Sequence, residues 1–340
     1  MTPRRHVCAI MLAFGPEPYL REAVAAVLAS DGVDVELLLV DNGCTTDAVA
    51  ELPADPRLRV ITPDRNLGFT GGVDLGAREA TAPVLALVNS DAVVEPGALR
   101  ALAEALDDPS TGLVCGLVTL GADPETVNSV GNPVHVLGLS WAGHMGEPAA
   151  AHRTPTDIAS TTGALMAARA STWAELGGFP EEYFAYLEDL ELSWRTWQRG
   201  LRVRYVPTAR ARHYYEFSRT PLKMYLVERN RLLFLATCHS GRTLALLALP
   251  LLAFEAAITL IAASQGWGRQ KIAGWRWIMR HLGWVRERRR TVQAARTVPD
   301  RELAHLLGTR FDPAQFPLPP GGGLLQAALA AYWRLARRLL

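Results

Sequence analysis

The sequence lacks the cysteine spacing of a zinc ribbon or of a disulfide-rich secreted protein. Its four cysteines, Cys8, Cys44, Cys115 and Cys238, lie far apart, and none belongs to a C-x-x-C pair. This pattern predicts neither a structural zinc site nor a disulfide framework, and it favours a reducing compartment.

A cleavable signal peptide is not expected either. The apolar run Val7–Phe14 follows Arg4 and Arg5, but it is only about eight residues long and no small-residue cleavage site comes after it. We therefore interpret Val7–Leu12 as a first β-strand.

An excess of charge of one sign is also missing. The 340 residues include 35 basic and 34 acidic residues, so the net charge is +1 and predicts no nucleic-acid partner. With 49% apolar and 20% charged residues, global disorder is excluded. The charge is uneven, because residues 264–296 hold nine basic residues against one acid, Glu287, which leaves −7 for the rest of the chain. This basic segment predicts contact with an anionic surface.

Short apolar runs alternate with helical periods over residues 1–120. The expected strands are Val7–Leu12, Leu37–Val40, Leu58–Thr62, Val84–Val88 and Leu113–Val118. Between the first two, one helix face is formed by Leu20, Ala23, Val24, Val27 and Leu28. Continuous apolar strands indicate a sheet that is covered on both faces. This order predicts an α/β fold with a mostly parallel central sheet flanked by helices.

Residues 121–160 change character, with Gly, Pro and Asn and little periodicity. We expect hairpins and loops over the sheet there, and we interpret His135, His144 and His152 as ordinary polar loop residues rather than substrate contacts. Regular structure resumes after residue 160. The expected elements are a short helix over Ala164–Leu176, a break at Gly177-Gly178, a helix from about Glu188 to Gly200, and a strand over Val203–Val206 that ends at Pro207.

A long apolar segment covers residues 243–263 and contains one charge, Glu255, and one proline, Pro250. Its length suits a membrane span of about 20 residues, but a buried core helix is the alternative. The residues that follow are rich in Arg and Trp, which membrane interfaces favour.

Two expected strands end in acidic residues. Asp41 follows Val40, and Asp91 comes shortly after the strand Val84–Val88. Ligands bind at the carboxyl edge of an open α/β sheet, so we expect both carboxylates at one binding edge. Asp41 could accept hydrogen bonds from a base or ribose, and Asp91 could hold a divalent cation on a diphosphate. The alternative is that each acid only starts a turn or caps a helix.

A glycine-rich stretch lies between these acids, Asn66-Leu67-Gly68-Phe69-Thr70-Gly71-Gly72. Its glycines permit close backbone approach, and the following helix offers N–H donors to an anion. A Rossmann G-x-G-x-x-G is absent after the first strand, where Gly15-Pro16-Glu17-Pro18 stands, which counts against nicotinamide cofactor chemistry.

Three acids crowd the start of a later helix: Glu188, Asp189 and Glu191. They could simply complement the positive helix N-terminus. Crowded carboxylates beside apolar side chains also keep a raised proton affinity, which suits a general base. His213 follows 24 residues after Asp189 and is either structural or a metal ligand.

Taken in order, these segments resemble the family 2 glycosyltransferases of the GT-A fold, in their bacterial rhamnosyltransferase-like branch. The similarity covers about residues 5–235. It is carried by Val40-Asp41-Asn42, the glycine-rich stretch, Asn89-Ser90-Asp91, Thr162-Gly163-Ala164-Leu165-Met166, the run from Gly177-Gly178-Phe179-Pro180 to Glu188-Asp189, Arg195, Gly200, Pro207 and His213.

The resemblance implies roles on the donor side. Asp41 would contact the nucleotide base, and Asn66 and Gly68 would lie beside the nucleotide. Asn89-Ser90-Asp91 matches the D-x-D element, so Asp91 would hold Mg²⁺ or Mn²⁺ and Asn89 would lie near the ribose. His213 would complete the metal or diphosphate site.

It also implies roles on the acceptor side. Asp189 would deprotonate the acceptor hydroxyl, Glu188 would orient acceptor or donor, and Gly163 and Tyr186 would contact the acceptor. Two positions depart from the family pattern: Asn89 leaves one carboxylate in the D-x-D element, and Glu191 stands where Asp is common. The Q-x-x-R-W element of processive synthases is absent, so a single addition is expected.

The implied reaction is an inverting, metal-assisted transfer of a sugar, rhamnose or another hexose, from a nucleotide diphosphate donor to a hydroxyl acceptor. A polyprenyl-diphosphate-linked glycan or another polysaccharide precursor fits as the acceptor. The alternatives are a nucleotidyltransferase and a catalytically silent membrane-bound module that binds sugar nucleotides. A nucleotidyltransferase would want a basic loop after the first strand, but Gly15–Leu20 has no Lys or Arg.

We expect three regions along the chain. Residues 1–235 form the catalytic domain, with a nucleotide-sugar-binding half over 1–120 and an acceptor half over 121–235. Residues 236–316 form an apolar and basic membrane-association region, and residues 317–340 form a linker and a basic amphipathic helix. This organisation predicts a peripheral, re-entrant or single-span attachment to the anionic cytoplasmic face of the cell membrane. It predicts no oligomeric state.

Overall fold

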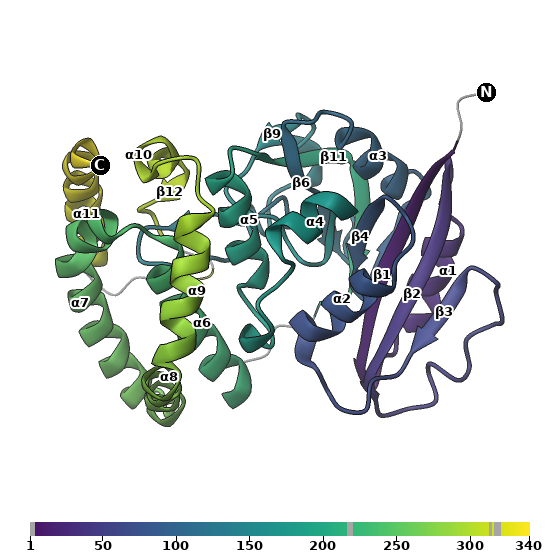
Figure 1. Cartoon of the computed structure of the whole chain (residues 1–340), viewed down its shortest axis with the longest axis horizontal. Coiled ribbons are helices and arrows are strands. Elements are labelled where there is room, and N and C mark those ends of the chain that lie inside the picture. Colours follow the sequence, from purple (N-terminus) through teal and green to yellow (C-terminus); the bar gives the residue numbers. More distant parts are fainter. Residues whose placement is uncertain (1–3, 216–219, 313–314, 316–320) are drawn as a thin grey trace. The chain divides into compact units, whose positions relative to one another are not determined.

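The computed structural model describes residues 4–215, 220–312, 315 and 321–340. It divides into two compact units (Figure 1). The first unit comprises Met1–Asn132, Ala142–Thr196 and Leu201–Phe217, and the second comprises Pro133–Trp141, Trp197–Gly200 and Ser218–Leu340.

A mixed β-sheet forms the centre of the first unit (Figure 1). Its strand order is β3-β2-β1-β4-β10-β6-β11-β5, with β7 paired to β6 and β9 to β11. In this order β10 and β5 run against the other six strands. The strands are β1 (Arg5–Gly15), β2 (Val33–Cys44), β3 (Leu58–Ile61), β4 (Val84–Val88), β5 (Ala92–Val94), β6 (Thr111–Leu120), β7 (Val127–Ser129), β9 (Thr156–Asp157), β10 (Leu165–Arg169) and β11 (Arg202–His213).

Helices flank this sheet, as the sequence predicts. They are α1 (Leu20–Leu28), α2 (Gly68–Glu79), α3 (Ala98–Ala105), α4 (Ala170–Leu176) and α5 (Glu188–Gln198). On β1, Ala9 and Met11 are buried in the core that α1 and α3 complete. The alternate residue Leu12 faces α2, where a Cβ atom on Gly72 would lie 2.3 Å from Leu12 Cδ1. Only a glycine lets α2 lie this close to the sheet.

The predicted helix over Ala164–Leu176 is wrong in its first half. Leu165–Arg169 forms β10, an antiparallel strand between β4 and β6, and only Ala170–Leu176 is helical. The segment Leu165-Met166-Ala167-Ala168 has good intrinsic helix formers. Pairing on both sides overrides that preference: Met166 lies opposite both Leu87 and Cys115.

The predicted end of a strand at Pro207 is also wrong. β11 continues to His213, with a register shift between Val206 and Arg210. Proline has no N–H to donate to the ladder and is tolerated at a bulge. After the irregularity, β11 pairs again with β6 and also with β5, which brings His213 opposite Ala92.

Helices make up most of the second unit. They are α6 (Pro221–Cys238), α7 (Gly241–Ser264), α8 (Gly268–Arg280), α9 (Leu282–Ala294), α10 (Asp300–Leu303) and α11 (Gly322–Ala336). Two short strands, β8 (Val134–His135) and β12 (Leu307–Gly308), pair in parallel. The expected linker residues 317–320 lie outside the described part of the chain.

A buried cluster of four charges joins α6, α7 and α8. Lys271 Nζ lies 2.6 Å from Glu228 Oε2 and 3.0 Å from Glu255 Oε2. Arg231 pairs with the same two carboxylates and is fully buried. Two cations and two carboxylates offset one another, so the cluster adds no net charge to the interior. Its members hold three helices in one arrangement.

This cluster explains the single charge in the apolar segment. Glu255 points toward Arg231 and Lys271 rather than outward, while the other faces of α7 remain apolar. Leu249, Leu252 and Leu260 are 69–73% exposed. Within the described residues, α7 is the one helix that is long and apolar enough to cross a membrane. A core helix would bury these leucine side chains, so α7 does not have the packing of a core helix.

Replacing Arg231 with Met should lower the free energy of unfolding by about 3–5 kcal/mol, because it leaves the buried Glu228 and the partly buried Glu255 with one cation. Urea denaturation measures this difference. The matched control is Arg290→Met, which breaks an exposed pair with Glu287 and should cost no more than about 1 kcal/mol. Equal losses in the two variants would contradict the stabilising role of the cluster.

Candidate functional site

The end of β2 is joined to the glycine-rich stretch by a buried amide. The Asn42 side chain donates to Asn66 Oδ1 at 2.9 Å and to the Gly68 carbonyl at 3.1 Å, and it accepts from the Leu67 N–H at 2.8 Å. The half-buried Asp41 lies beside it, and its Oδ1 accepts from the Cys44 N–H at 2.9 Å. Asp41 therefore does start a turn, which was the alternative to a binding role. The same hydrogen bond fixes its carboxylate at the sheet edge.

Gly68 begins α2 against the segment that precedes α5. A Cβ atom at Gly68, where φ is +69°, would lie 2.4 Å from the Phe184 carbonyl oxygen. The Thr70 N–H donates to that same carbonyl at 3.1 Å. Phe184, Tyr186 and Leu187 also have φ values between +64° and +71°, which side chains other than glycine rarely adopt. Such strain, about 1–3 kcal/mol per residue, is typical of functional sites.

The residues that follow β4 meet the end of β11. His213 Nε2 lies 3.0 Å from Asp91 Oδ1 and 3.4 Å from Asn89 Nδ2. On the other side of the ring, Nδ1 lies 3.0 Å from Asn128 Oδ1 on β7. This contact with Asn128 orients the ring so that Nε2 faces Asp91. The structure thus brings together Asn89, Asp91 and His213, the three residues to which the family resemblance assigns one metal or diphosphate site.

A second cluster forms at the start of α5. Asp189 Oδ1 accepts from the Leu190 N–H at 2.7 Å, and Asp189 Oδ2 accepts from Asn132 Nδ2 at 3.2 Å. The Gly163 N–H also donates to this carboxylate. Burial raises the pKa of Asp189 above its usual range, although these donors act in the opposite direction.

Glu188 lies beside Asp189 but has a different environment. It is 6% exposed, and within the described residues its Oε2 has no hydrogen-bond partner. Burial raises the pKa of Glu188, and the negative charge of Asp189 raises it further. Two adjacent carboxyls in such a site do not both ionise, so the donors favour the charge on Asp189 and the proton on Glu188.

Backbone and side-chain contacts connect the two clusters. The Asn89 N–H donates to the Ala164 carbonyl at 3.1 Å, next to Gly163. Ser129, which follows Asn128, donates to Asn132 Oδ1 at 3.0 Å. Both clusters therefore share the same edge of the first unit.

Two tyrosine side chains also lie between the cluster at His213 and the cluster at Glu188. Tyr215 stacks on His213 with ring centroids 5.5 Å apart. Burial raises the pKa of Tyr186, with smaller contributions from Tyr215 and Glu188. Tyr186 is 37% exposed, so part of its ring remains accessible to a ligand.

Glu191, whose role the sequence leaves open, is structural. It is fully buried and its Oε2 accepts from Arg195 Nε at 2.7 Å. Arg195 also donates to the carbonyls of Leu176 and Gly178, at the end of α4. The pair holds α5 against the Gly177-Gly178 break.

Sequence reasoning missed three asparagines that position the site: Asn42, Asn128 and Asn132. Asn42 belongs to the Val40-Asp41-Asn42 motif, in which the family resemblance assigns a role to Asp41 alone. Asn128 and Asn132 lie in the aperiodic residues 121–160, where nothing in the sequence distinguishes a buried amide from a loop amide.

The glycosyl transferase family 2 model matches residues 8–172. The chain is 27% identical to N-acetylglucosaminyl-diphospho-decaprenol L-rhamnosyltransferase of Mycobacterium tuberculosis over 262 residues, which cover 68% of this chain and 84% of that protein.

Two solved structures share the fold. The mannosyltransferase PcManGT from Pyrobaculum calidifontis, in complex with GDP-Man and Mn²⁺, aligns with a TM-score of 0.52 at 18% identity over 99% of this chain and 87% of its own. GalNAc-T7 with UDP, GalNAc and Mn²⁺ aligns with a TM-score of 0.56 at 16% identity, over 68% of this chain and 48% of its own. The fold is therefore GT-A, and the chain is a nucleotide-sugar glycosyltransferase that is similar in sequence to glycosyltransferase family 2 and to its rhamnosyltransferase-like members.

Proposed function

We propose that this glycosyltransferase transfers one sugar from a nucleotide diphosphate donor to a hydroxyl acceptor with inversion, and that Asp189 is the base. The observation that carries the proposal is the pairing of two clusters at one edge: Asp91 with His213, and Asp189 with its three donors. The first suits a diphosphate and its counterion, and the second suits a proton acceptor. The similarity to family 2 glycosyltransferases argues against the nucleotidyltransferase alternative.

The residues around Asp91 fit a divalent cation. A hard cation such as Mg²⁺ prefers oxygen ligands and is commonly held by one or two carboxylates together with substrate phosphates. Asp91 supplies the carboxylate, and Asn128 directs His213 Nε2 toward the same position. When bound, Mg²⁺ or Mn²⁺ would neutralise the charge that develops on the leaving diphosphate. Both solved structures named above contain Mn²⁺.

Asp189 can take a proton from the acceptor oxygen. Its raised pKa makes it a stronger base than an ordinary aspartate, while the donors from Asn132, Gly163 and Leu190 keep it oriented. Attack from the side opposite the leaving group inverts the anomeric configuration. The protonated Glu188 can donate a hydrogen bond to acceptor or donor.

On the donor side, Asp41 and the stretch from Asn66 to Gly68 are proposed to hold the nucleotide. Asn42 ties these two segments together, and α2 begins there with N–H groups that suit an anion. Gly163 and Tyr186 border Asp189 and Glu188, which supports their proposed contact with the acceptor.

A lipid-linked acceptor at the cytoplasmic face of the membrane is the further part of the proposal. The mycobacterial relative is named for an acceptor carried on decaprenol diphosphate. Exposed leucines on α7 offer an apolar face, and the exposed Arg269, Arg276, Arg280 and Arg286 of the basic segment offer cations for anionic lipid. The sugar, rhamnose or another hexose, follows from the relative's name alone.

Asp189→Asn should fold normally and lose transfer by about 10²–10⁴-fold, because an amide cannot accept the acceptor proton. Rates of nucleotide diphosphate release with donor and acceptor present measure the effect, and circular dichroism checks the fold. Asp34→Asn, an exposed change on β2, is the matched control. Turnover like that of the native chain would reassign the base.

Glu188→Gln should stabilise the chain by a margin that grows from about pH 5 to pH 8. In the folded state the raised pKa keeps Glu188 protonated, whereas the unfolded chain loses that proton above about pH 4.3 and is favoured as pH rises. Thermal unfolding midpoints across this range measure the margin, with the exposed Glu51→Gln as a control for loss of one carboxyl. A margin that is constant or shrinks with pH would disprove the buried, protonated state.

Replacing Leu249, Leu252 and Leu260 together with Gln should move the chain from the membrane fraction to the soluble fraction. Each exposed leucine that enters an apolar phase contributes about 1.5–3 kcal/mol. Fractionation at low and high salt measures the shift, and Val60→Gln on β3 is the control for loss of an exposed apolar side chain. An unchanged distribution would exclude α7 as the attachment surface.

A further inference from the structure

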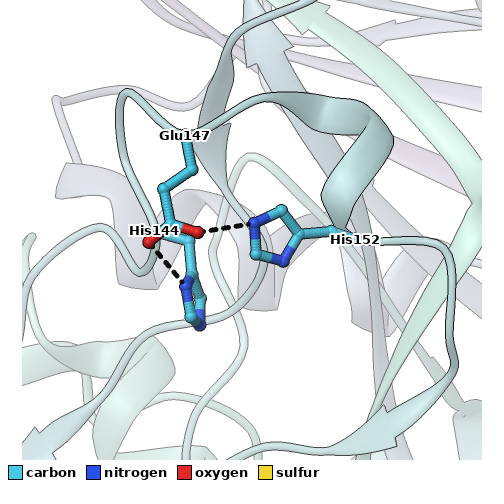
Figure 2. Close-up of side chains that lie close together, drawn as sticks. All are labelled: His144, Glu147 and His152. Atoms are coloured by element: carbon cyan, nitrogen blue, oxygen red, sulfur yellow. Dashed lines mark hydrogen bonds and ion pairs between the residues drawn. The ribbon is translucent and has the colours of Figure 1, made fainter.

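Two histidines and one glutamate converge in the loop that follows β8. Figure 2 shows Glu147 between the two imidazole rings, with one carboxylate oxygen directed at each. His144 Nδ1 lies 3.1 Å from Glu147 Oε1, and His152 Nε2 lies 2.9 Å from Glu147 Oε2. The two rings have centroids 4.6 Å apart. One ligand atom from each residue falls within 4.8 Å of the other two.

This arrangement suits a transition metal. Zn²⁺ binds imidazole nitrogen at about 2.0–2.1 Å and carboxylate oxygen at about 2.0–2.2 Å, and two His with one Glu is a ligand set that Zn²⁺ takes when a fourth position stays open to water. The three ligand atoms lie within 4.8 Å of one another, so small side-chain rotations bring them to these bond lengths around one ion. A pair of imidazoles favours Zn²⁺, Ni²⁺ or Cu²⁺ over Mg²⁺. The site at Asp91 differs, because it has one imidazole, His213, beside a carboxylate and would add diphosphate oxygens.

The cluster is held by two different strands of the first unit. Glu147 pairs with β7 through the Val127 N–H, which donates to its carbonyl at 2.9 Å. His152 is held from β11, because the Tyr205 hydroxyl donates to its carbonyl at 2.8 Å. His152 is also the least exposed of the three, with 14% of its side chain accessible against 54% for His144. Two of the three ligands therefore have fixed backbones before any ion binds.

We propose that His144, Glu147 and His152 form a binding site for Zn²⁺ or a similar transition metal, separate from the site at Asp91. The bound ion closes residues 144–152 into a loop that is locked onto β7. This proposal does not depend on the transfer reaction.

Metal binding at this cluster would also stabilise part of the candidate site, because the loop pairs with β7 and the residues that follow it. The segment that pairs with this loop carries Asn128, which orients His213, and Asn132, which donates to Asp189. Gly143 continues the pairing on both sides, since it accepts from the Val130 N–H at 3.2 Å and donates to the Gly131 carbonyl at 3.0 Å. The metal therefore acts as a clamp on a segment with two positioning residues.

The test is calorimetric titration of the full chain with ZnCl₂ after removal of metals, in excess Mg²⁺. We expect one site that the Mg²⁺ does not block. His144→Ala and His152→Ala should each weaken it by at least about 100-fold, since even changes beyond the direct ligands cost about 10–100-fold. Asp91→Asn should leave it intact. His281→Ala and His305→Ala remove exposed histidines elsewhere and are the matched controls.

Hydrogen exchange gives a second readout that needs no activity. Zn²⁺ should slow exchange of the Val127 and Val130 amides in the native chain but not in His152→Ala, and circular dichroism confirms that the variant folds. Equal zinc affinity in the native chain and both histidine variants, or affinity lost to Mg²⁺, would mean an adventitious ion only. Either result, or absence of zinc binding, would overturn the proposal.

Discussion

Two neighbouring carboxyls lie at the start of α5, Glu188 buried and Asp189 partly buried, and the hydrogen-bond donors around them determine which one is charged. The donors from Asn132, Gly163 and Leu190 act on Asp189, while Glu188 Oε2 has no partner among the described residues. A charge without water is costly unless donors surround it. Residues far apart in sequence must therefore meet at one point, and the mixed sheet, with β10 inserted between β4 and β6, is what brings them there.

In the second unit, charged side chains inside the protein are stabilised by pairing with opposite charges rather than by neutral donors. Its interior holds Arg231, Lys271, Glu228 and Glu255, yet their charges offset one another. Because Glu255 is used internally, α7 can be apolar on its outer face and still be fixed to α6 and α8. In the sequence, the charge of Glu255 argues against membrane contact. In the structure, Glu255 pairs inside the unit, so the outer face of α7 stays apolar.

The sequence predicts what is local and periodic. The five early strands, α1 and α5 are confirmed, because their apolar runs and helical spacing directly reflect burial. It could not predict β10, since Leu165-Met166-Ala167-Ala168 favours a helix until two strands pair with it. In the site, Asp91 is predicted by its place after a strand and His213 by the family resemblance alone, and the structure places their side chains 3.0 Å apart. Asn128 and Asn132 are not, because their role depends on where an aperiodic loop lies.

The irregularity in β11 determines where His213 can lie. Val206 is paired with Gly116 and Arg210 with Leu117, so residues 207–209 lie between two consecutive rungs of the ladder. Side chains alternate between the faces of a strand, and a shift of one residue moves all that follow to the other face. The composition of this short segment is constrained at Ala209, which is buried in the core. Its length is constrained as well, because an insertion or deletion of one residue there would turn the histidine away from Asp91.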